Sequence, residues 1–142
     1  MADLTITAAN VSAGSDCKQV ILTAGVAITQ GMCLFRNPVD GRAYKSVSND
    51  LTASRAEYIA LGPGVIGQPF VGALLDIGGN INLGATLAVG KVYAVSSNAG
   101  AIRPIDDVVA SDYITVIGIA TTTSNLVIRI NYGGVQTAGD VT

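Results

Sequence analysis

The sequence contains no histidine and no tryptophan, and only 13% of its 142 residues are charged. Histidine is the usual general base near neutral pH and the commonest metal ligand, so its absence removes the most familiar catalytic and metal sites. The 8 basic and 10 acidic residues give a net charge of −2, whereas nucleic-acid binding needs an excess of basic residues. We therefore expect a protein that is not an enzyme, holds no metal or cofactor and binds no nucleic acid.

The low charge and a mean hydropathy of +0.50 raise the question of a membrane span. The longest uncharged run, residues 58–75, contains four glycines and two prolines. Breakers at that density would leave backbone groups unsatisfied in lipid, so we expect no membrane partner. The start of the chain, residues 1–4, lacks the basic and apolar regions of a signal peptide, which predicts a protein made and used without secretion.

Cysteine is scarce as well, with Cys17 and Cys33 the only two in the chain. A structural zinc site needs further cysteine or histidine ligands. Disulfides are typical of secreted chains too small to build their own core. We therefore expect two free thiols that pack as small apolar side chains.

What the chain has in plenty is apolar residues, at 49%, and glycine, at 17 residues. They form short segments separated by turn residues, and residues 4–8 and 19–23 alternate or nearly alternate as half-buried strands do. The segment Asn37–Gly41 combines proline with Asp-Gly and predicts a hairpin turn. Further strands are expected at residues 32–36, 43–47, 68–75, 79–83 and 91–96, with an extended piece from Ile102 that ends at Pro104.

The clearest predicted element is a hairpin near the end of the chain. Residues 113–120 are apolar on both faces, as in a central strand, and residues 121–125 form a polar turn. Residues 126–132 then alternate, which directs Arg129 and Asn131 outward. The inward side chains of that strand are expected to be Leu126, Ile128, Ile130 and Tyr132.

Residues 51–61 form the one helix candidate, because they hold several alanines, Thr52 or Ser54 is available as a cap, and Gly62-Pro63 would stop the helix. The whole pattern predicts a single all-β domain over residues 1–142. Its expected architecture is a β-barrel or jelly-roll-like sandwich of about eight to ten short strands with at most one short helix. Residues 1–13 are a possible N-terminal arm, and residues 133–142 are expected to form a tail.

Two motifs resemble functional sites but are better explained as ordinary structural features. Residues 62–67 match G-x-G-x-x-G, but prolines interrupt the loop and the following segment is predicted to be a strand, so a turn is favoured over a dinucleotide site. Three aspartates and a serine crowd one loop without the spacing of a calcium motif, and solvated carboxylates are the favoured interpretation. These four residues are Asp106, Asp107, Ser111 and Asp112.

So few charges leave much of the surface to small and apolar residues, and such surfaces are typical of subunit contacts. The second half of the chain adds small-residue turns and strands. Their sequences are Gly67-Gln68-Pro69, Leu83-Gly84-Ala85-Thr86-Leu87, Gly90 with Val92-Tyr93 and Ser96, Gly100-Ala101-Ile102-Arg103-Pro104, and Tyr113-Ile114-Thr115-Val116-Ile117-Gly118-Ile119-Ala120. Over residues 60–132 these motifs resemble the head decoration or cement proteins of tailed bacteriophages.

The resemblance implies a β-barrel, jelly roll or related sandwich that binds the outside of an icosahedral phage capsid. It implies a dimer or trimer that cements subunits of the major capsid protein against the pressure of packaged DNA. The location would be the exterior of the virion, assembled in the host cytoplasm. The alternative is a receptor- or carbohydrate-binding module of a phage fibre or head fibre, with several of the five tyrosines lining a groove.

Six residues are the candidates for capsid or subunit contact. Leu4 and Ile6 lie in an extended N-terminal segment that either adds a strand to a neighbour's sheet or belongs to the protein's own sheet. Arg36 and Arg42 flank the predicted turn at residues 37–41. The remaining two, on the outward face of the last strand, are Arg129 and Asn131.

Overall fold

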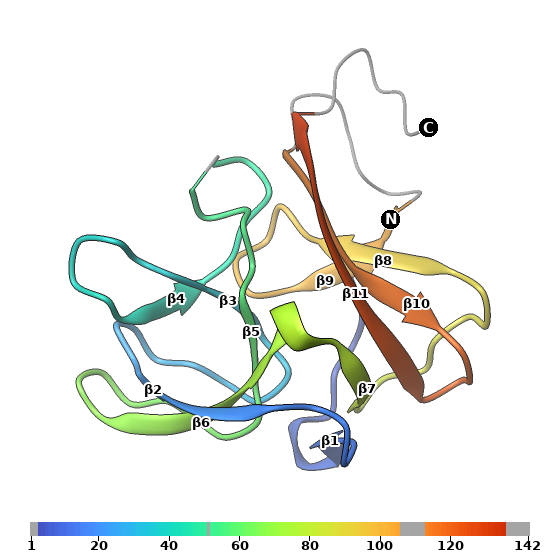
Figure 1. The fold of residues 1–142 in the computed structure, drawn as a ribbon, viewed down its shortest axis with the longest axis horizontal. Helices are drawn as coiled ribbons and strands as arrows, with labels where there is room; N and C mark the ends of the chain where they lie inside the picture. The colour runs from blue at the N-terminus through green and yellow to red at the C-terminus, as the bar shows by residue number, and fades with distance from the viewer. Residues whose placement is uncertain (1–2, 51, 106–112, 136–142) are drawn as a thin grey trace.

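The computed structural model describes residues 3–50, 52–105 and 113–135 of the chain. These residues form two antiparallel sheets (Figure 1), one of six strands in the order β1-β7-β11-β10-β8-β9 and one of five in the order β2-β6-β5-β3-β4. The strands are β1 (Val11–Ala13), β2 (Gln19–Thr23), β3 (Cys33–Arg36), β4 (Ala43–Lys45), β5 (Tyr58–Ala60), β6 (Pro69–Leu74), β7 (Gly79–Leu83), β8 (Val92–Val95), β9 (Ile102–Pro104), β10 (Tyr113–Ala120) and β11 (Asn125–Val135).

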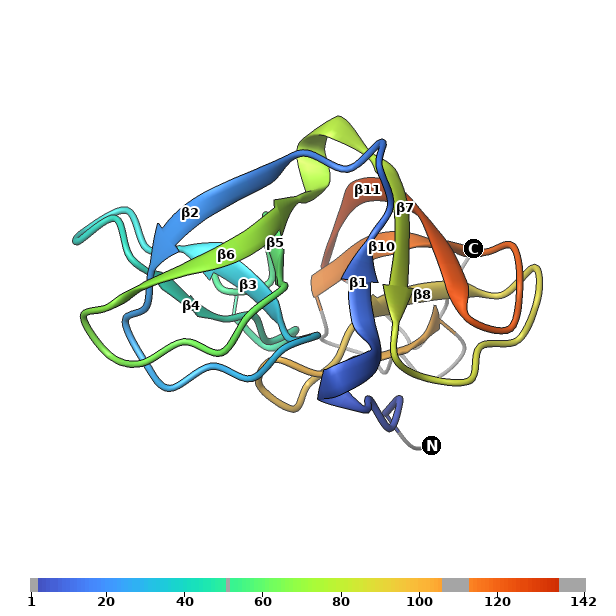
Figure 2. The same ribbon diagram turned by 90° about the horizontal axis from the view of Figure 1, so that it is seen from below.

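This arrangement confirms the predicted all-β fold and selects the sandwich, because no continuous ladder of the described strands closes either sheet into a barrel. An isolated parallel bridge, Ala24–Ala43, joins the end of β2 to β4. The eleven strands exceed the expected number by one. The helices in the described part of the chain are two short 3₁₀ turns, η1 (Ala8–Asn10) and η2 (Leu75–Ile77), and none there is long and apolar enough to cross a membrane. Figure 2 shows η2 as the link that takes the chain from β6 in one sheet to β7 in the other.

Two groups of buried side chains hold the sheets. The inter-sheet cluster draws residues from both sheets and includes Cys33, Ile59, Ile81 and Leu126. The outer cluster lies on the other face of the five-stranded sheet and contains Ala24, Ile28, Leu34, Ala43, Tyr58, Ala60 and Phe70. Because successive strand residues point to opposite faces, adjacent residues of β3 and of β5 enter different clusters, and all of β5 is buried.

The predicted turn between β3 and β4 is confirmed, and its own polar side chains shape it. Asn37 Oδ1 accepts a hydrogen bond from the Val39 N–H at 2.9 Å, and Asp40 Oδ1 accepts one from the Arg42 N–H at 3.0 Å. Gly41 closes the turn with φ +72°, a conformation that glycine adopts without strain. The hairpin therefore forms from local chemistry that is visible in the sequence.

The predicted helix at residues 51–61 is wrong. A single turn near residues 52–54 is capped by Asp50, whose Oδ1 accepts from the Ala53 N–H at 2.9 Å. The segment then becomes β5, which pairs with β3 and β6 in the middle of the five-stranded sheet. Burial on both sides of the sheet outweighs the helical preference of the alanines, since propensity is a small term compared with core packing.

The predicted strand at residues 4–8 is also wrong as a strand. Leu4 N–H donates to Ile102 O at 2.8 Å, and Thr7 N–H donates to Gly84 O at 2.7 Å. Ile102 lies in β9 and Gly84 follows β7, on opposite sides of the six-stranded sheet, so no continuous ladder forms. The chain then enters η1 before the short strand β1.

The tail predicted from residue 133 begins later. Residues 133–135 belong to β11, where Gly134 pairs with Ile114 and Val135 pairs with Tyr113. The long partner strand β10 thus extends β11 past the point where its sequence stops alternating. Residues 136–142 lie outside the described part of the chain.

Candidate functional site

The two N-terminal contact candidates lie against the chain's own domain. Leu4 is half-buried and packs on the inter-sheet cluster. Ile6 is also half-buried, and its Cγ2 would lie only 2.6 Å from a Cβ placed on Gly31. Both side chains line a small groove of about 210 Å³ together with Met32 and Gly100. In this structure the N-terminal segment lies against the chain's own sheets, although residues 4–7 form no strand of either sheet.

Asp3 fastens that segment to the six-stranded sheet. Its carboxylate accepts hydrogen bonds from Ser96 Oγ and Asn98 Nδ2, both at 2.6 Å, and forms an ion pair of 3.3 Å with Arg103 Nε. Partial burial opposes ionisation of Asp3, but the hydrogen bonds and the guanidinium outweigh it, so the pKa of Asp3 is lowered from 3.8. Sequence reasoning missed this contact, because 100 residues separate Asp3 from Arg103.

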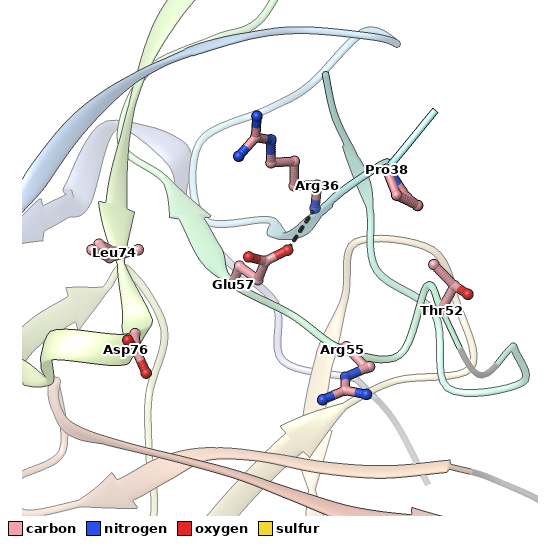
Figure 3. A pocket seen from close by; sticks show the side chains of 7 residues that line it. All are labelled: Arg36, Pro38, Thr52, Arg55, Glu57, Leu74 and Asp76. Carbon is pink, nitrogen blue, oxygen red and sulfur yellow. Dashed lines mark hydrogen bonds between the residues drawn. The ribbon is translucent and has the colours of Figure 1, made fainter. Parts of the chain in front are cut away.

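Arg36 and Arg42 lie at the two ends of the β3–β4 turn, joined by the hydrogen bond from Asn37 N–H to Arg42 O at 2.9 Å. Arg36 is exposed and lines a cleft of about 470 Å³ (Figure 3). Its backbone N–H donates to Glu57 Oε2 at 3.1 Å, as the dashed line shows. The full lining is Arg36, Pro38, Thr52, Arg55, Glu57, Leu74 and Asp76.

The cleft offers two guanidinium groups and two carboxylates. In Figure 3, Glu57 lies between the arginines, while Asp76 lies beside Leu74 on the facing wall. Such balanced charge suits salt links to another polar surface and does not single out an anion or a cation. Exposed ion pairs contribute little affinity and mainly fix the orientation of a contact.

Arg129 and Asn131 are exposed on β11, as the alternating pattern predicted. Leu126 and Ile128 of the same strand are buried, and Ile130 packs against the inter-sheet cluster. The six predicted contact residues therefore occupy three places: the N-terminal segment, the β3–β4 turn and the outer face of β11. The β3–β4 turn belongs to the five-stranded sheet and β11 to the six-stranded sheet (Figure 1).

The cysteines are free thiols, as predicted. Cys33 belongs to the inter-sheet cluster, and complete burial raises its pKa to about 12. Cys17 packs against that cluster, and its Sγ donates to Asn80 O at 2.9 Å. Burial, the main cause, also raises the pKa of Cys17. Neither thiol is activated as a nucleophile.

The glycine-rich segment at residues 62–67 is the predicted turn, within the β5–β6 loop. Gly64 and Ile28 exchange two backbone hydrogen bonds of 2.8 and 2.9 Å, which fasten the loop to a neighbouring segment. Within the described part of the chain, no three His, Cys, Asp or Glu side chains are grouped as metal ligands. The acidic segment at residues 106–112 lies outside that part.

Tyr44, Tyr58 and Tyr93 do not share a groove. Tyr58 is buried in the outer cluster and Tyr93 in the inter-sheet cluster. Tyr44 donates its hydroxyl hydrogen to Asp40 Oδ2 at 2.7 Å, a bond that raises the pKa of Tyr44 and lowers that of Asp40. This distribution gives no support to a tyrosine-lined sugar site.

Sequence reasoning missed a set of exposed aliphatic side chains on the five-stranded sheet and its loops. The exposed fractions are 71% for Ile21 on β2, 92% for Val39 in the β3–β4 turn, and 65% and 60% for Val65 and Ile66 in the β5–β6 loop. For the loop, the sequence did indicate exposure, because Val65 and Ile66 lie between Gly64 and Gly67 and outside any predicted strand that could bury them. For Ile21 no such indication was present, because a strand sequence does not show which strand lies at an edge.

Neither a scan against protein-family models nor a search of curated proteins found a match to this chain.

Proposed function

We propose that the chain is a structural virion protein that binds the outer surface of an icosahedral phage capsid and cements subunits of the major capsid protein against internal DNA pressure. The observation that supports this most directly is that four of the six exposed large apolar side chains in the described part of the chain lie on β2 and the loops of the five-stranded sheet: Ile21, Val39, Val65 and Ile66. Val65 and Ile66 are adjacent in the β5–β6 loop, and adjacent apolar side chains exposed on a surface are typical of protein–protein contacts.

The β5–β6 loop is the best-formed part of this surface. Its residues 61–68 include no charge, and two anchors hold it: the Ile28–Gly64 pair and the hydrogen bond from Gly67 N–H to Ala24 O at 2.8 Å. An anchored loop loses little conformational freedom on binding, so more of the contact energy remains as affinity. Val65 and Ile66 are thus presented in a fixed geometry.

A cementing role does not require a large contact surface on each copy, because the same contact is made by every copy in the oligomer. A small oligomer that touches several capsid subunits binds its second and third sites at high effective concentration, so each contact is allowed to be weak. The polar cleft at Arg36 and the outward Arg129 and Asn131 add orientation at other points of the same domain. The proposed mechanism is mechanical and needs no reacting group.

The first test counts copies. Heads purified from the phage that encodes the chain are analysed by quantitative mass spectrometry against the major capsid protein. A shell component is present in hundreds of copies, whereas a fibre module is present in a handful. A handful of copies, or none on tail-free heads, contradicts the proposal.

The second test addresses the surface. Ile66→Asp places a charge in the proposed contact and should raise the apparent Kd for heads, measured as occupancy over a range of protein concentrations, by roughly tenfold or more, which corresponds to about 1.4 kcal/mol. Val89→Asp is the matched control, because Val89 is 65% exposed and lies in the β7–β8 connection of the other sheet. Equal occupancy by the two folded variants contradicts the assignment of the β5–β6 loop.

A further inference from the structure

A cleft of about 520 Å³ lies at the end of the six-stranded sheet where β7 and β10 end and β1 and β11 begin. Three segments of the chain line it: the N-terminal segment at residues 5–10, the start of the β7–β8 connection and the β10–β11 turn. Figure 2 shows the connection leaving β7 beside the N-terminal segment and passing toward the β10–β11 turn. The volume lies within the range of about 300–1,000 Å³ that is usual for small-molecule sites.

Hydrogen bonds hold the three segments in place around the cleft. The Thr7 N–H donates to Gly84 O at 2.7 Å, and the Leu87 N–H donates to Thr123 O at 2.8 Å. Asn82 Oδ1 accepts a hydrogen bond from the Gly84 N–H at 2.8 Å, which fixes the first turn of the connection. The cleft therefore has its shape before any ligand arrives, and little conformational freedom is lost on binding.

The described residues that line this cleft carry no charge. Two of them, Gly84 and Ala85, are small, and the others present hydroxyl or carboxamide groups. The polar set is Thr5, Thr7, Asn10, Asn82, Thr86, Thr123 and Ser124. An ion would give up its hydration here without meeting an opposite charge, so the cleft favours a neutral ligand.

Most of these polar groups are available to a ligand. Apart from Asn82, the polar side chains of the cleft make no hydrogen bond to any other described residue, and all of them are exposed. A hydroxyl or a carboxamide both donates and accepts hydrogen bonds. The ligand that satisfies this lining best therefore carries several closely spaced groups that also donate and accept.

We propose that this cleft binds a neutral saccharide. Neighbouring carbons of a sugar ring carry hydroxyl groups, which match the uncharged lining in both donating and accepting hydrogen bonds. Gly84 and Ala85 are small enough to let the C–H face of the ring approach the backbone of the β7–β8 connection. The described lining offers no aromatic ring for stacking, and each hydrogen bond contributes little net free energy. The dissociation constants should therefore lie in the millimolar range.

Titration of the isolated, isotope-labelled protein with free sugars tests the site. Glucose, galactose, mannose and N-acetylglucosamine are added separately, each up to tens of millimolar, and the backbone amide shifts are followed by NMR. At least one sugar should give saturable shifts concentrated at Gly84, Thr86 and Ser124. No saturable shift with any of the four sugars, or shifts centred elsewhere in the domain, overturns the proposal.

Glucuronate tests whether the ligand is neutral. It has nearly the shape of glucose but carries a negative charge, and it should bind no more tightly than glucose. Tighter binding of glucuronate that weakens with added salt would contradict a site for neutral ligands.

Thr86→Val combined with Ser124→Ala removes two hydroxyls from the cleft. Neither side chain bonds to another described residue, so the fold should be unchanged. The pair should weaken sugar binding by roughly fivefold or more, the loss expected when one or two hydrogen bonds disappear. The matched control is Thr23→Val with Ser15→Ala, at exposed positions of β2 and the β1–β2 connection, which should bind as wild type does. Equal binding by the two double variants overturns the proposal.

These measurements use the isolated protein and do not depend on capsid binding. Their failure leaves head occupancy through the β5–β6 loop open, and a protein absent from heads should still bind the sugar.

Discussion

Arg103 is a buried charged side chain that depends on polar partners from other parts of the chain. It is 7% exposed on β9, and its Nη2 donates to Ser96 Oγ and Ser97 Oγ at 2.9 and 2.7 Å. Asp3 supplies the opposite charge. A buried guanidinium that loses its carboxylate keeps its desolvation cost without the compensating attraction. Asp3, the first described residue of the chain, therefore stabilises the buried Arg103.

Asp3→Asn should lower the free energy of unfolding by about 1.5–3 kcal/mol at pH 7, the range for hydrogen bonds to a charged group. The pKa of Asp3 is below 3.8 in the folded state, so its ionised form stabilises the fold above pH 3.8. That contribution disappears as pH falls through the lowered folded pKa. Urea titrations at several pH values should show wild type and variant converging in acid.

Asp76→Asn is the control for the loss of one negative charge, since Asp76 is exposed. Its effect should stay within about 0.5 kcal/mol. A difference between wild type and Asp3→Asn that persists unchanged in acid would show that the charge of Asp3 is not what stabilises the fold.

At the scale of elements, the sequence predicts those strands whose signals are local. The β3–β4 and β10–β11 hairpins have turn residues between apolar runs, and both are present. The strand β5 was missed because its three residues become a strand only between β3 and β6. Outward Arg129 followed from alternation within one strand, whereas the bridge between Ala24 and Ala43 of β4 depends on how the whole five-stranded sheet curves.

Gly118 is a position where β10 approaches β11 too closely for a side chain. It lies in β10 beside a register shift, and a Cβ there would overlap the carbonyl oxygen of Val127 in β11. Gly118→Ala should therefore force the strands apart and lower the free energy of unfolding by about 3 kcal/mol, the upper part of the usual cost of overpacking. Thermal and denaturant unfolding followed by circular dichroism measure this.

Gly62→Ala is the matched substitution, because a Cβ at Gly62 has no atom within 4 Å and the residue has no positive φ. It should be neutral or slightly stabilising, since alanine restricts the unfolded chain. Similar losses in the two variants would contradict the close β10–β11 approach.

At the scale of the whole molecule, the inter-sheet cluster makes the two sheets depend on each other. Ile59 comes from the five-stranded sheet and Ile81 from the six-stranded one, and both are fully buried in the same cluster. Composition predicted a β domain with a core, but not that one sheet would have apolar clusters on both faces. That arrangement depends on how residues 24–32 fold back over the five-stranded sheet, which no local pattern specifies.

Ile59→Ala should lower the free energy of unfolding by about 2–5 kcal/mol through loss of buried contacts and the cavity left behind. Because the cluster is shared, unfolding should remain one transition, with tyrosine fluorescence and far-ultraviolet circular dichroism coinciding. Val39→Ala, at a side chain that is 92% exposed, should change stability by less than about 0.5 kcal/mol. Two separated transitions in Ile59→Ala would show that the sheets fold independently.

The order of strands along the chain also sets an order of events during synthesis. The five-stranded sheet is one continuous stretch, residues 19–74, placed between the first strand of the six-stranded sheet and the other five. All residues of the outer cluster belong to that stretch. At roughly 5–20 residues per second, the ribosome needs several seconds more to add β7 to β11. The strand β1 emerges first, yet it waits for β7 before it has a neighbour.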